Sequence, residues 1–64
     1  MSSELIKALE FAINAEAKAR DHYENMAKLA EEPETRLLCE QLAREENSHY
    51  ERLCHRLNAI KLLG

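Results

Sequence analysis

The chain has 64 residues and a formal net charge of −3, with acidic and basic residues interspersed and no basic stripe. Its apolar runs are far shorter than the roughly 20 residues that span a bilayer. These features argue against nucleic-acid binding and a membrane segment, and they predict a soluble, cytoplasmic protein. With one Phe, two Tyr and no Trp, the chain can bury only a small core, so we expect a single domain over residues 1–64.

The first predicted element is a long helix over residues 4 to about 31, since no Gly or Pro interrupts this stretch. Pro33 is the only proline, and acidic residues surround it, which predicts a tight turn at about residues 32–33. A second helix is predicted from about residue 34 to 62, and the sequence has no strand signal. Because the connection is short, the fold class is all-α, with the two helices packed as an antiparallel hairpin.

Each predicted helix carries a repeat of alternating four- and three-residue steps, which marks a buried face. In the first helix the repeat is Leu5, Leu9, Ala12, Glu16, Ala19, Tyr23, Met26, Ala30, and in the second it is Thr35, Cys39, Leu42, Glu46, His49, Leu53, Arg56, Ile60, Leu63. Glu16, Glu46 and His49 interrupt these otherwise largely apolar faces at mid-length. A buried polar group without a partner costs on the order of 2–7 kcal/mol, so the three residues predict a shared partner.

The three interrupting residues should also lie at one height along the hairpin. Glu16 precedes Glu32 by nearly the same number of positions as Glu46 and His49 follow it, and the difference is less than one helical turn. Glu46 and His49 form a Glu-x-x-His pair, whose i, i+3 spacing places a carboxylate and an imidazole on one helix face. A metal ion is the partner that would use all three side chains.

A hairpin has one helix-to-helix interface, so outer apolar residues such as Ile6, Ile13, Leu38 and Leu57 would stay exposed in a monomer. We therefore expect at least a homodimer, which would form a four-helix bundle. A carboxylate-bridged two-metal bundle needs one Glu from each of two helices and a Glu-x-x-His from each of the other two, and the dimer supplies this set. Four carboxylates would balance two divalent cations. Oxygen and imidazole ligands suit iron or manganese, and imidazole also suits zinc.

Other interpretations of these residues remain open. Tyr23 lies one repeat after Glu16, so its hydroxyl could donate a hydrogen bond to the ligands, or its ring could simply fill the interface. Glu45 is an i, i+4 neighbour of His49 and could replace Glu46, although it lies off the repeat. Without a metal, the polar residues could set the helix register or form an ion pair.

These residues give the chain a resemblance to a known family. It resembles a two-helix member of the ferritin-like superfamily, most like the encapsulated ferritins, with rubrerythrin-type domains as more distant relatives. Glu16, Tyr23, Glu46 and His49 carry the resemblance, within the stretches AINAEAKARDHYENMAKLAEE and LAREENSHYERL. The resemblance implies a ferroxidase that oxidises Fe(II) to Fe(III) at a di-iron centre of two ions per dimer, with Glu16, Glu46 and His49 as catalytic metal ligands.

The same resemblance implies an iron storage or detoxification role, a ring of dimers, and an encapsulin shell as partner and compartment. Encapsulated members carry a C-terminal targeting tail, and this sequence ends at Gly64, so we expect either that a tail follows in the full protein or that it is not shell cargo. Cys39 and Cys54 form no Cys-x-x-Cys pair, so we expect no rubredoxin-like module. The alternative functions are a rubrerythrin-like, peroxide-reducing di-iron protein and a metal-free helical interaction module.

Overall fold

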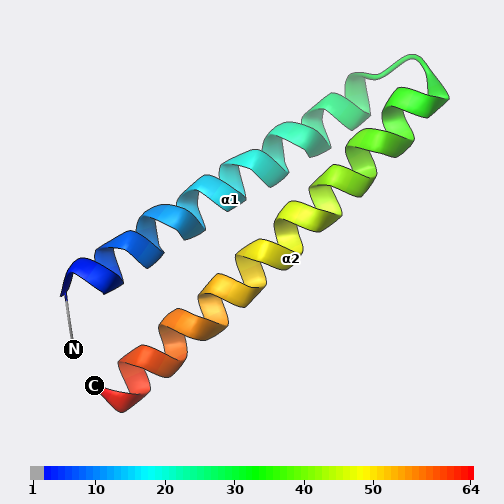
Figure 1. The fold of residues 1–64 in the computed structure, drawn as a ribbon. Helices are drawn as coiled ribbons and strands as arrows, with labels where there is room; N and C mark the ends of the chain where they lie inside the picture. Colours follow the sequence, from blue (N-terminus) through cyan, green and yellow to red (C-terminus); the bar gives the residue numbers. More distant parts are fainter. Residues whose placement is uncertain (1–2) are drawn as a thin grey trace.

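The computed structural model describes residues 3–64, which form two helices and, within that range, no strand. Helix α1 spans Ser3–Leu29 and helix α2 spans Pro33–Leu63. They lie side by side and antiparallel, with the start of α1 and the end of α2 at the same end of a rod of 48 × 15 × 10 Å (Figure 1). The predicted all-α helical hairpin is confirmed. Neither described helix combines the length and apolar character needed to cross a membrane.

The helix boundaries differ slightly from the prediction at the turn. Helix α1 ends at Leu29, a little early, and Pro33 is the first residue of α2 rather than part of the turn. Proline suits a first helical position because its fixed φ is helical and that position needs no N–H donor. Glu32 before it is extended, with φ −85° and ψ 129°, as the residue preceding a proline tends to be. The connection is therefore residues 30–32.

The helix interface is small and follows a straight-helix period. Its buried residues are Leu9 and Ala27 on α1, and Cys39, Ala43 and Leu57 on α2. Leu9 and Ala27 are separated by the same number of residues as Cys39 and Leu57. At roughly 3.6 residues per turn, this separation makes about five whole turns, which returns to the same face.

The predicted seven-residue repeat is therefore wrong for parts of the interface. Met26 was expected to be buried but is 40% exposed, and Ala27 takes its place. Leu57 was expected to remain exposed but is only 9% exposed. A strict seven-residue repeat drifts by about 20° per heptad on a straight helix, so it stays on one face only where helices supercoil. Further members of the predicted repeat are exposed: Leu5, Thr35, Arg56 and Leu63.

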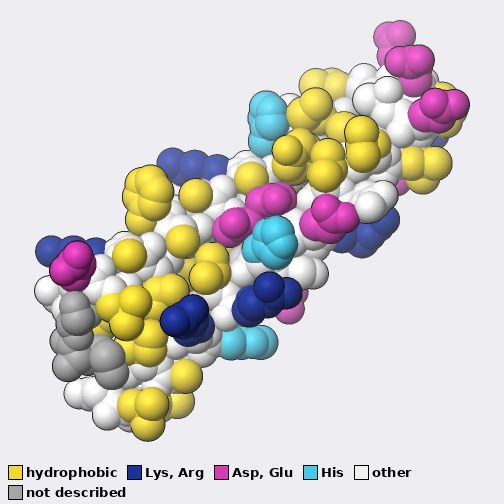
Figure 2. Space-filling view, viewed as in Figure 1, with side chains coloured by type: hydrophobic (Ala, Val, Ile, Leu, Met, Phe, Trp, Pro, Cys, Tyr) yellow, Lys and Arg dark blue, Asp and Glu magenta, His cyan; other side chains and the backbone are white. Residues whose placement is uncertain are grey.

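One flank of the hairpin keeps large apolar side chains uncovered. Leu5 lies about three helical turns before Glu16, and Leu38 lies about three turns before His49, so they share a face with these polar residues. Both leucines are exposed. Figure 2 shows hydrophobic side chains in groups on either side of acidic and histidine side chains at mid-length. We call this face, which contains Glu16, Glu46 and His49, the cluster flank.

Candidate metal centre

The three residues singled out from the sequence come together at the middle of the hairpin. Glu16 extends from α1, and Glu46 and His49 extend from α2. His49 Nδ1 lies 3.4 Å from Glu16 Oε2 and 3.9 Å from Glu46 Oε1. One ligand atom from each of the three residues lies within 4.8 Å of the others. Counting residues from the turn thus predicted the proximity correctly.

The prediction that these residues are buried in the interface is wrong. The side chains of Glu16, Glu46 and His49 are 26%, 24% and 48% exposed, and no polar residue in the described chain is fully buried. The reason is the drift of the seven-residue repeat, which places them at the edge of the interface rather than at its centre. The cluster is consequently enclosed on one side by the helices and open on the other.

One atom of the cluster lacks a nitrogen or hydroxyl donor. Among the described residues, Glu16 Oε2 is inaccessible to solvent and has no such hydrogen-bond partner. The nearby Nδ1 of His49, at 3.4 Å, is in ion-pair range only. Leaving a buried acceptor unsatisfied costs about 1–3 kcal/mol, and more for a charged group. A cation at this position would remove the penalty.

The two carboxyl groups also influence each other. The pKa of Glu46 is raised, chiefly because a protonated Glu46 carboxyl can share its proton with the adjacent carboxyl of Glu16, and further because of burial and the negative charge of Glu16. The charge of His49 acts in the opposite direction, and that of Glu45 adds slightly to the increase. In the metal-free protein a proton on Glu46 therefore reduces the repulsion between the two carboxyl groups. A divalent cation can take the place of that proton, with release of the proton.

The geometry and the donor atoms fit a metal ion. Ligand atoms bound to one ion at about 2.0–2.2 Å lie at most about 4.4 Å apart. The observed limit of 4.8 Å therefore requires only a small contraction. Two carboxylates and an imidazole form a set that iron, manganese and zinc accept. Nδ1, the imidazole nitrogen facing the carboxylates, is the atom placed to bind.

The other residues considered from the sequence lie outside this cluster. Tyr23 is half-buried and contacts the edge of His22, with ring centroids 6.2 Å apart. Within residues 3–64 its hydroxyl makes no hydrogen bond to the cluster, so a role for Tyr23 beside the metal remains a prediction. Glu45 is exposed, accepts a hydrogen bond from Gln41 Nε2 at 3.0 Å, and is not among the residues whose ligand atoms come together. His55, a further histidine of α2, is exposed and lies outside the group.

Sequence reasoning missed a polar contact next to the cluster. Arg20 Nη1 donates a hydrogen bond to Asn47 Oδ1 at 2.9 Å, across the two helices. The Arg20 guanidinium also lies 5.0 Å from the centre of the Tyr50 ring and pairs with Asp21. The count from the turn did not point to it, because Arg20 lies about one helical turn closer to the connection than Glu16, whereas Asn47 lies one residue farther from the connection than Glu46.

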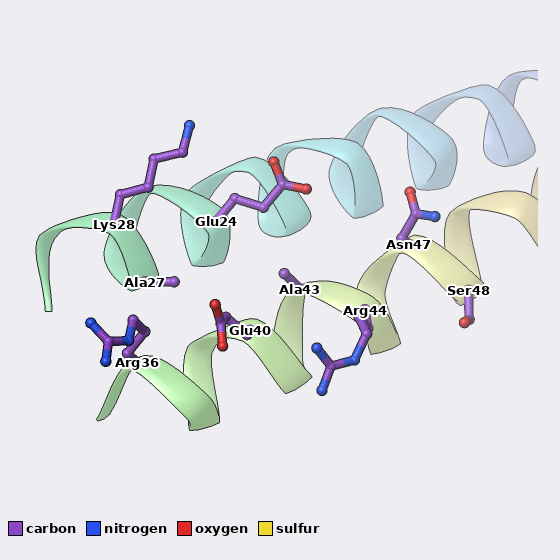
Figure 3. A pocket seen from close by; sticks show the side chains of 9 residues that line it. All are labelled: Glu24, Ala27, Lys28, Arg36, Glu40, Ala43, Arg44, Asn47 and Ser48. Atoms are coloured by element: carbon purple, nitrogen blue, oxygen red, sulfur yellow. The ribbon is translucent and has the colours of Figure 1, made fainter. Parts of the chain in front are cut away.

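A groove of the hairpin lies beside the cluster and does not contain it. It is an open groove between the turn-side halves of α1 and α2, where Ala27 and Ala43 leave space between the helices (Figure 3). Its lining consists of Glu24, Ala27, Lys28, Arg36, Glu40, Ala43, Arg44, Asn47 and Ser48. A single hairpin therefore offers three metal-ligating side chains at an open edge, without an enclosing pocket.

The family comparison agrees with this arrangement. The protein-family model described as Rubrerythrin matches residues 1–61, nearly the whole chain. The chain belongs to the rubrerythrin family. Comparisons with the curated proteins and with solved structures gave no match. Rubrerythrin membership confirms the expected ferritin-like, rubrerythrin-like superfamily and indicates a di-iron type of redox protein, but it does not specify the encapsulated-ferritin subtype.

Proposed function

We propose that this rubrerythrin-family chain is a ferroxidase of the encapsulated-ferritin type, which oxidises Fe(II) to Fe(III) at a di-iron centre shared by two copies. The observation that carries the proposal is the cluster of Glu16, Glu46 and His49, with their ligand atoms within 4.8 Å and the buried Glu16 Oε2 unsatisfied. The family match supports it, since this family typically binds iron. The physiological role would be iron storage or detoxification.

We propose that two copies share the centre because one chain supplies too few ligands to surround a metal ion. Three ligands fill only half of a six-coordinate shell, and the cluster is open on one side. The exposed leucines on the same flank would be covered if a second hairpin packed there. Two hairpins packed in this way supply a Glu from each of two helices and a Glu-x-x-His from each of the other two, which is the ligand set of a carboxylate di-iron bundle.

The residues have distinct tasks in this reaction. Fe(II) is the substrate, and each of two ions gives one electron to dioxygen or peroxide, which also takes up protons. The four carboxylates of a dimer compensate the charge of two divalent ions, and their hold on iron strengthens as its charge increases. Glu46 releases its proton as iron binds, because a bound ion and a proton compete for its carboxylate. His49 binds through Nδ1, the nitrogen that faces both carboxyl groups.

The family match favours a second candidate, a rubrerythrin-like protein that reduces peroxide. The same ligand set would serve it, with iron retained as a cofactor rather than consumed as a substrate. The two candidates differ in the oxidant and in the fate of iron. Rapid oxidation by hydrogen peroxide, slow oxidation by dioxygen and no accumulation of ferric product would favour the peroxide reductase.

The partners and metals of the protein are also proposals. We expect a homodimer at least, a ring of dimers as a larger assembly, and an encapsulin shell as the compartment if the subtype holds. Manganese or zinc would occupy the same ligands in vitro, since carboxylate and imidazole accept them.

Native mass spectrometry tests the proposed centre directly. The metal-free protein is supplied with Fe(II) under anaerobic conditions, and we expect two irons per dimer. Glu46→Ala should abolish iron uptake, whereas Glu45→Ala, which alters the neighbouring exposed carboxylate, should retain it. A wild-type dimer that takes up no iron would contradict the proposal and leave the helical interaction module as the better explanation.

A further inference from the structure

The part of the hairpin that holds the cluster has no buried apolar side chain to fix its register. On α1, the nearest buried residues on either side of Glu16 are Leu9 and Ala27. At about 1.5 Å rise per residue, they lie roughly 10 and 16 Å from Glu16 along the helix. Helix α2 likewise has no fully buried residue between Ala43 and Leu57. Apolar side chains at mid-length are only half-buried, so a specific polar contact there can add to the alignment of the two helices.

Arg20 makes the contact that can do this. Its guanidinium donates to Asn47 Oδ1 at 2.9 Å, partly buried, and lies 5.0 Å from the centre of the Tyr50 ring. Asp21 Oδ1 holds the same guanidinium at 3.0 Å from Nη2 and 3.1 Å from Nε. The amide of Asn47 is oriented in turn, because its Nδ2 donates to Glu51 at 2.8 Å. Each group in this contact, which we call the Arg20 clamp, therefore has a partner that fixes its orientation.

Outside the cluster, no other pair of side chains in residues 3–64 links the helices by a hydrogen bond. The groove beside the clamp is lined by charged residues from both helices, and within the described range none of them forms an ion pair (Figure 3). These groove residues are Glu24, Lys28, Arg36, Glu40 and Arg44. The groove charges therefore do not fix the register. Apart from the contacts within the cluster itself, the Arg20 clamp is the specific polar link between α1 and α2.

The clamp lies close to the metal-ligating residues on both helices. Arg20 is one turn after Glu16 on α1, and Asn47 directly follows Glu46 on α2. A shift of one residue between the helices moves a ligand by about 1.5 Å along the axis and about 100° around it, which would separate Glu16 from Glu46 and His49. We infer that Arg20 is a positioning residue: it acts through Asn47 and Tyr50 to hold Glu16 at the height of Glu46 and His49. This inference rests on the proposed function.

The first arm of the test measures iron affinity under anaerobic conditions. Arg20→Met keeps most of the side-chain length but removes the charge and the hydrogen bonds, and we expect about tenfold weaker Fe(II) binding, within the range found when groups that orient metal ligands are removed. Arg44→Met is the matched control, because Arg44 lies in the groove and has no ion pair. Leu9→Val controls for stability, since it loosens the interface far from the cluster.

The second arm uses the metal-free protein, so that it does not depend on iron. Arg20→Met, Asn47→Leu and the double variant are compared by urea denaturation, and Arg20→Lys tests whether charge alone suffices. We expect the losses in free energy of unfolding from the two single changes to be non-additive. The double variant should be no less stable than the less stable of the two single variants. Arg20→Lys should bind iron with an affinity between those of wild type and Arg20→Met, because an ammonium group lacks the planar fork of guanidinium.

The outcomes separate this inference from the proposed function. Weaker iron binding in Arg20→Met, beyond any change in Leu9→Val, together with coupling to Asn47, would support the positioning role. Unchanged iron affinity in a folded Arg20→Met variant would overturn it while leaving the proposed function intact, and so would strictly additive effects of the two changes. A wild-type protein that binds no iron would overturn the proposed function and the positioning role together, even if the metal-free coupling were present.

Discussion

The two flanks of the hairpin, the Arg20 side and the cluster flank, differ in whether their charged side chains have partners. On the Arg20 side, the guanidinium, the Asn47 amide and two carboxylates are paired within one chain. On the cluster flank, two carboxyl groups face each other, Glu16 Oε2 lacks a donor, and exposed leucines lie beyond them. The polar groups on the Arg20 side have partners within the single chain. On the cluster flank, the carboxyl groups would gain a partner only from an added cation, and the leucines would be covered only by another apolar surface. That contrast is the reason why we propose that a second copy packs against the cluster flank.

The largest expected effect concerns the imidazole of the cluster flank. His49→Ala should lower the rate of Fe(II) oxidation at least about 100-fold, since even changes behind a metal ligand cost 10–100-fold. His55→Ala changes an exposed histidine outside the cluster and should leave the rate unchanged. Stopped-flow oxidation with circular dichroism as a folding check would measure both. Equal rates in the two variants would remove His49 from the site.

The next effect concerns the apolar cover of the same flank. Leu38 is 54% exposed in the hairpin and would be buried in the proposed dimer. Leu38→Glu should weaken the dimer about 10–100-fold, because burying a leucine side chain is worth about 1.5–3 kcal/mol. Arg44→Glu, in the groove, should have no such effect. Sedimentation equilibrium would decide the matter, and an unchanged dimer in Leu38→Glu would place the interface elsewhere.

A smaller effect tests the unsatisfied carboxylate. Glu16→Leu should stabilise the metal-free protein by about 1–3 kcal/mol, since it removes a buried acceptor that has no donor. In the same variant, added metal should no longer raise the melting temperature. Glu24→Leu, in the groove, controls for added apolar surface. If Glu16→Leu were no more stable than Glu24→Leu, the unsatisfied Glu16 Oε2 would not destabilise the metal-free protein.

The smallest effect is a pH dependence that comes from Glu46. Its pKa is raised in the folded protein, so the folded state holds a proton that the unfolded state has released. The metal-free protein should therefore lose stability as pH rises from the ordinary glutamate pKa through the raised one. Metal affinity should change in the opposite direction and weaken as pH falls, because protons compete with the ion. Denaturation of Glu46→Gln across this range should show a flatter profile, and Glu40→Gln should resemble wild type.

The sequence was sufficient for the hairpin and for the meeting of the cluster, because both depend on position along the chain. Pro33 and the lack of other breaks define two helices, and nearly equal distances from the turn bring Glu16 to Glu46 and His49. The identity of the buried residues was less accessible. It depends on whether the helices supercoil. Because they follow a straight-helix period, Ala27 is buried in place of Met26, and the cluster lies at the exposed edge of the interface.

The Arg20 clamp was missed for a different reason. A cross-helix hydrogen bond leaves no periodic signal, because it depends on how long side chains orient rather than on their spacing alone. The apolar pattern that locates helices says nothing of a single Arg and Asn pair. Dimerisation and the bound metal remain predictions, since they are properties of two chains and an ion.

The short connection between α1 and α2 also determines when the site can form. Contacts in such a hairpin begin beside the turn and grow outward, and helical folds with mostly local contacts form in microseconds to milliseconds. In the proposed dimer, the ligands of one chain would therefore come together long before a second chain arrived at ordinary cellular concentrations. Completion of the centre would then be a second-order process. Because both partners are copies of the same chain, its rate should rise fourfold with each doubling of the chain concentration, so the supply of newly made chains would govern how quickly iron-handling capacity appears.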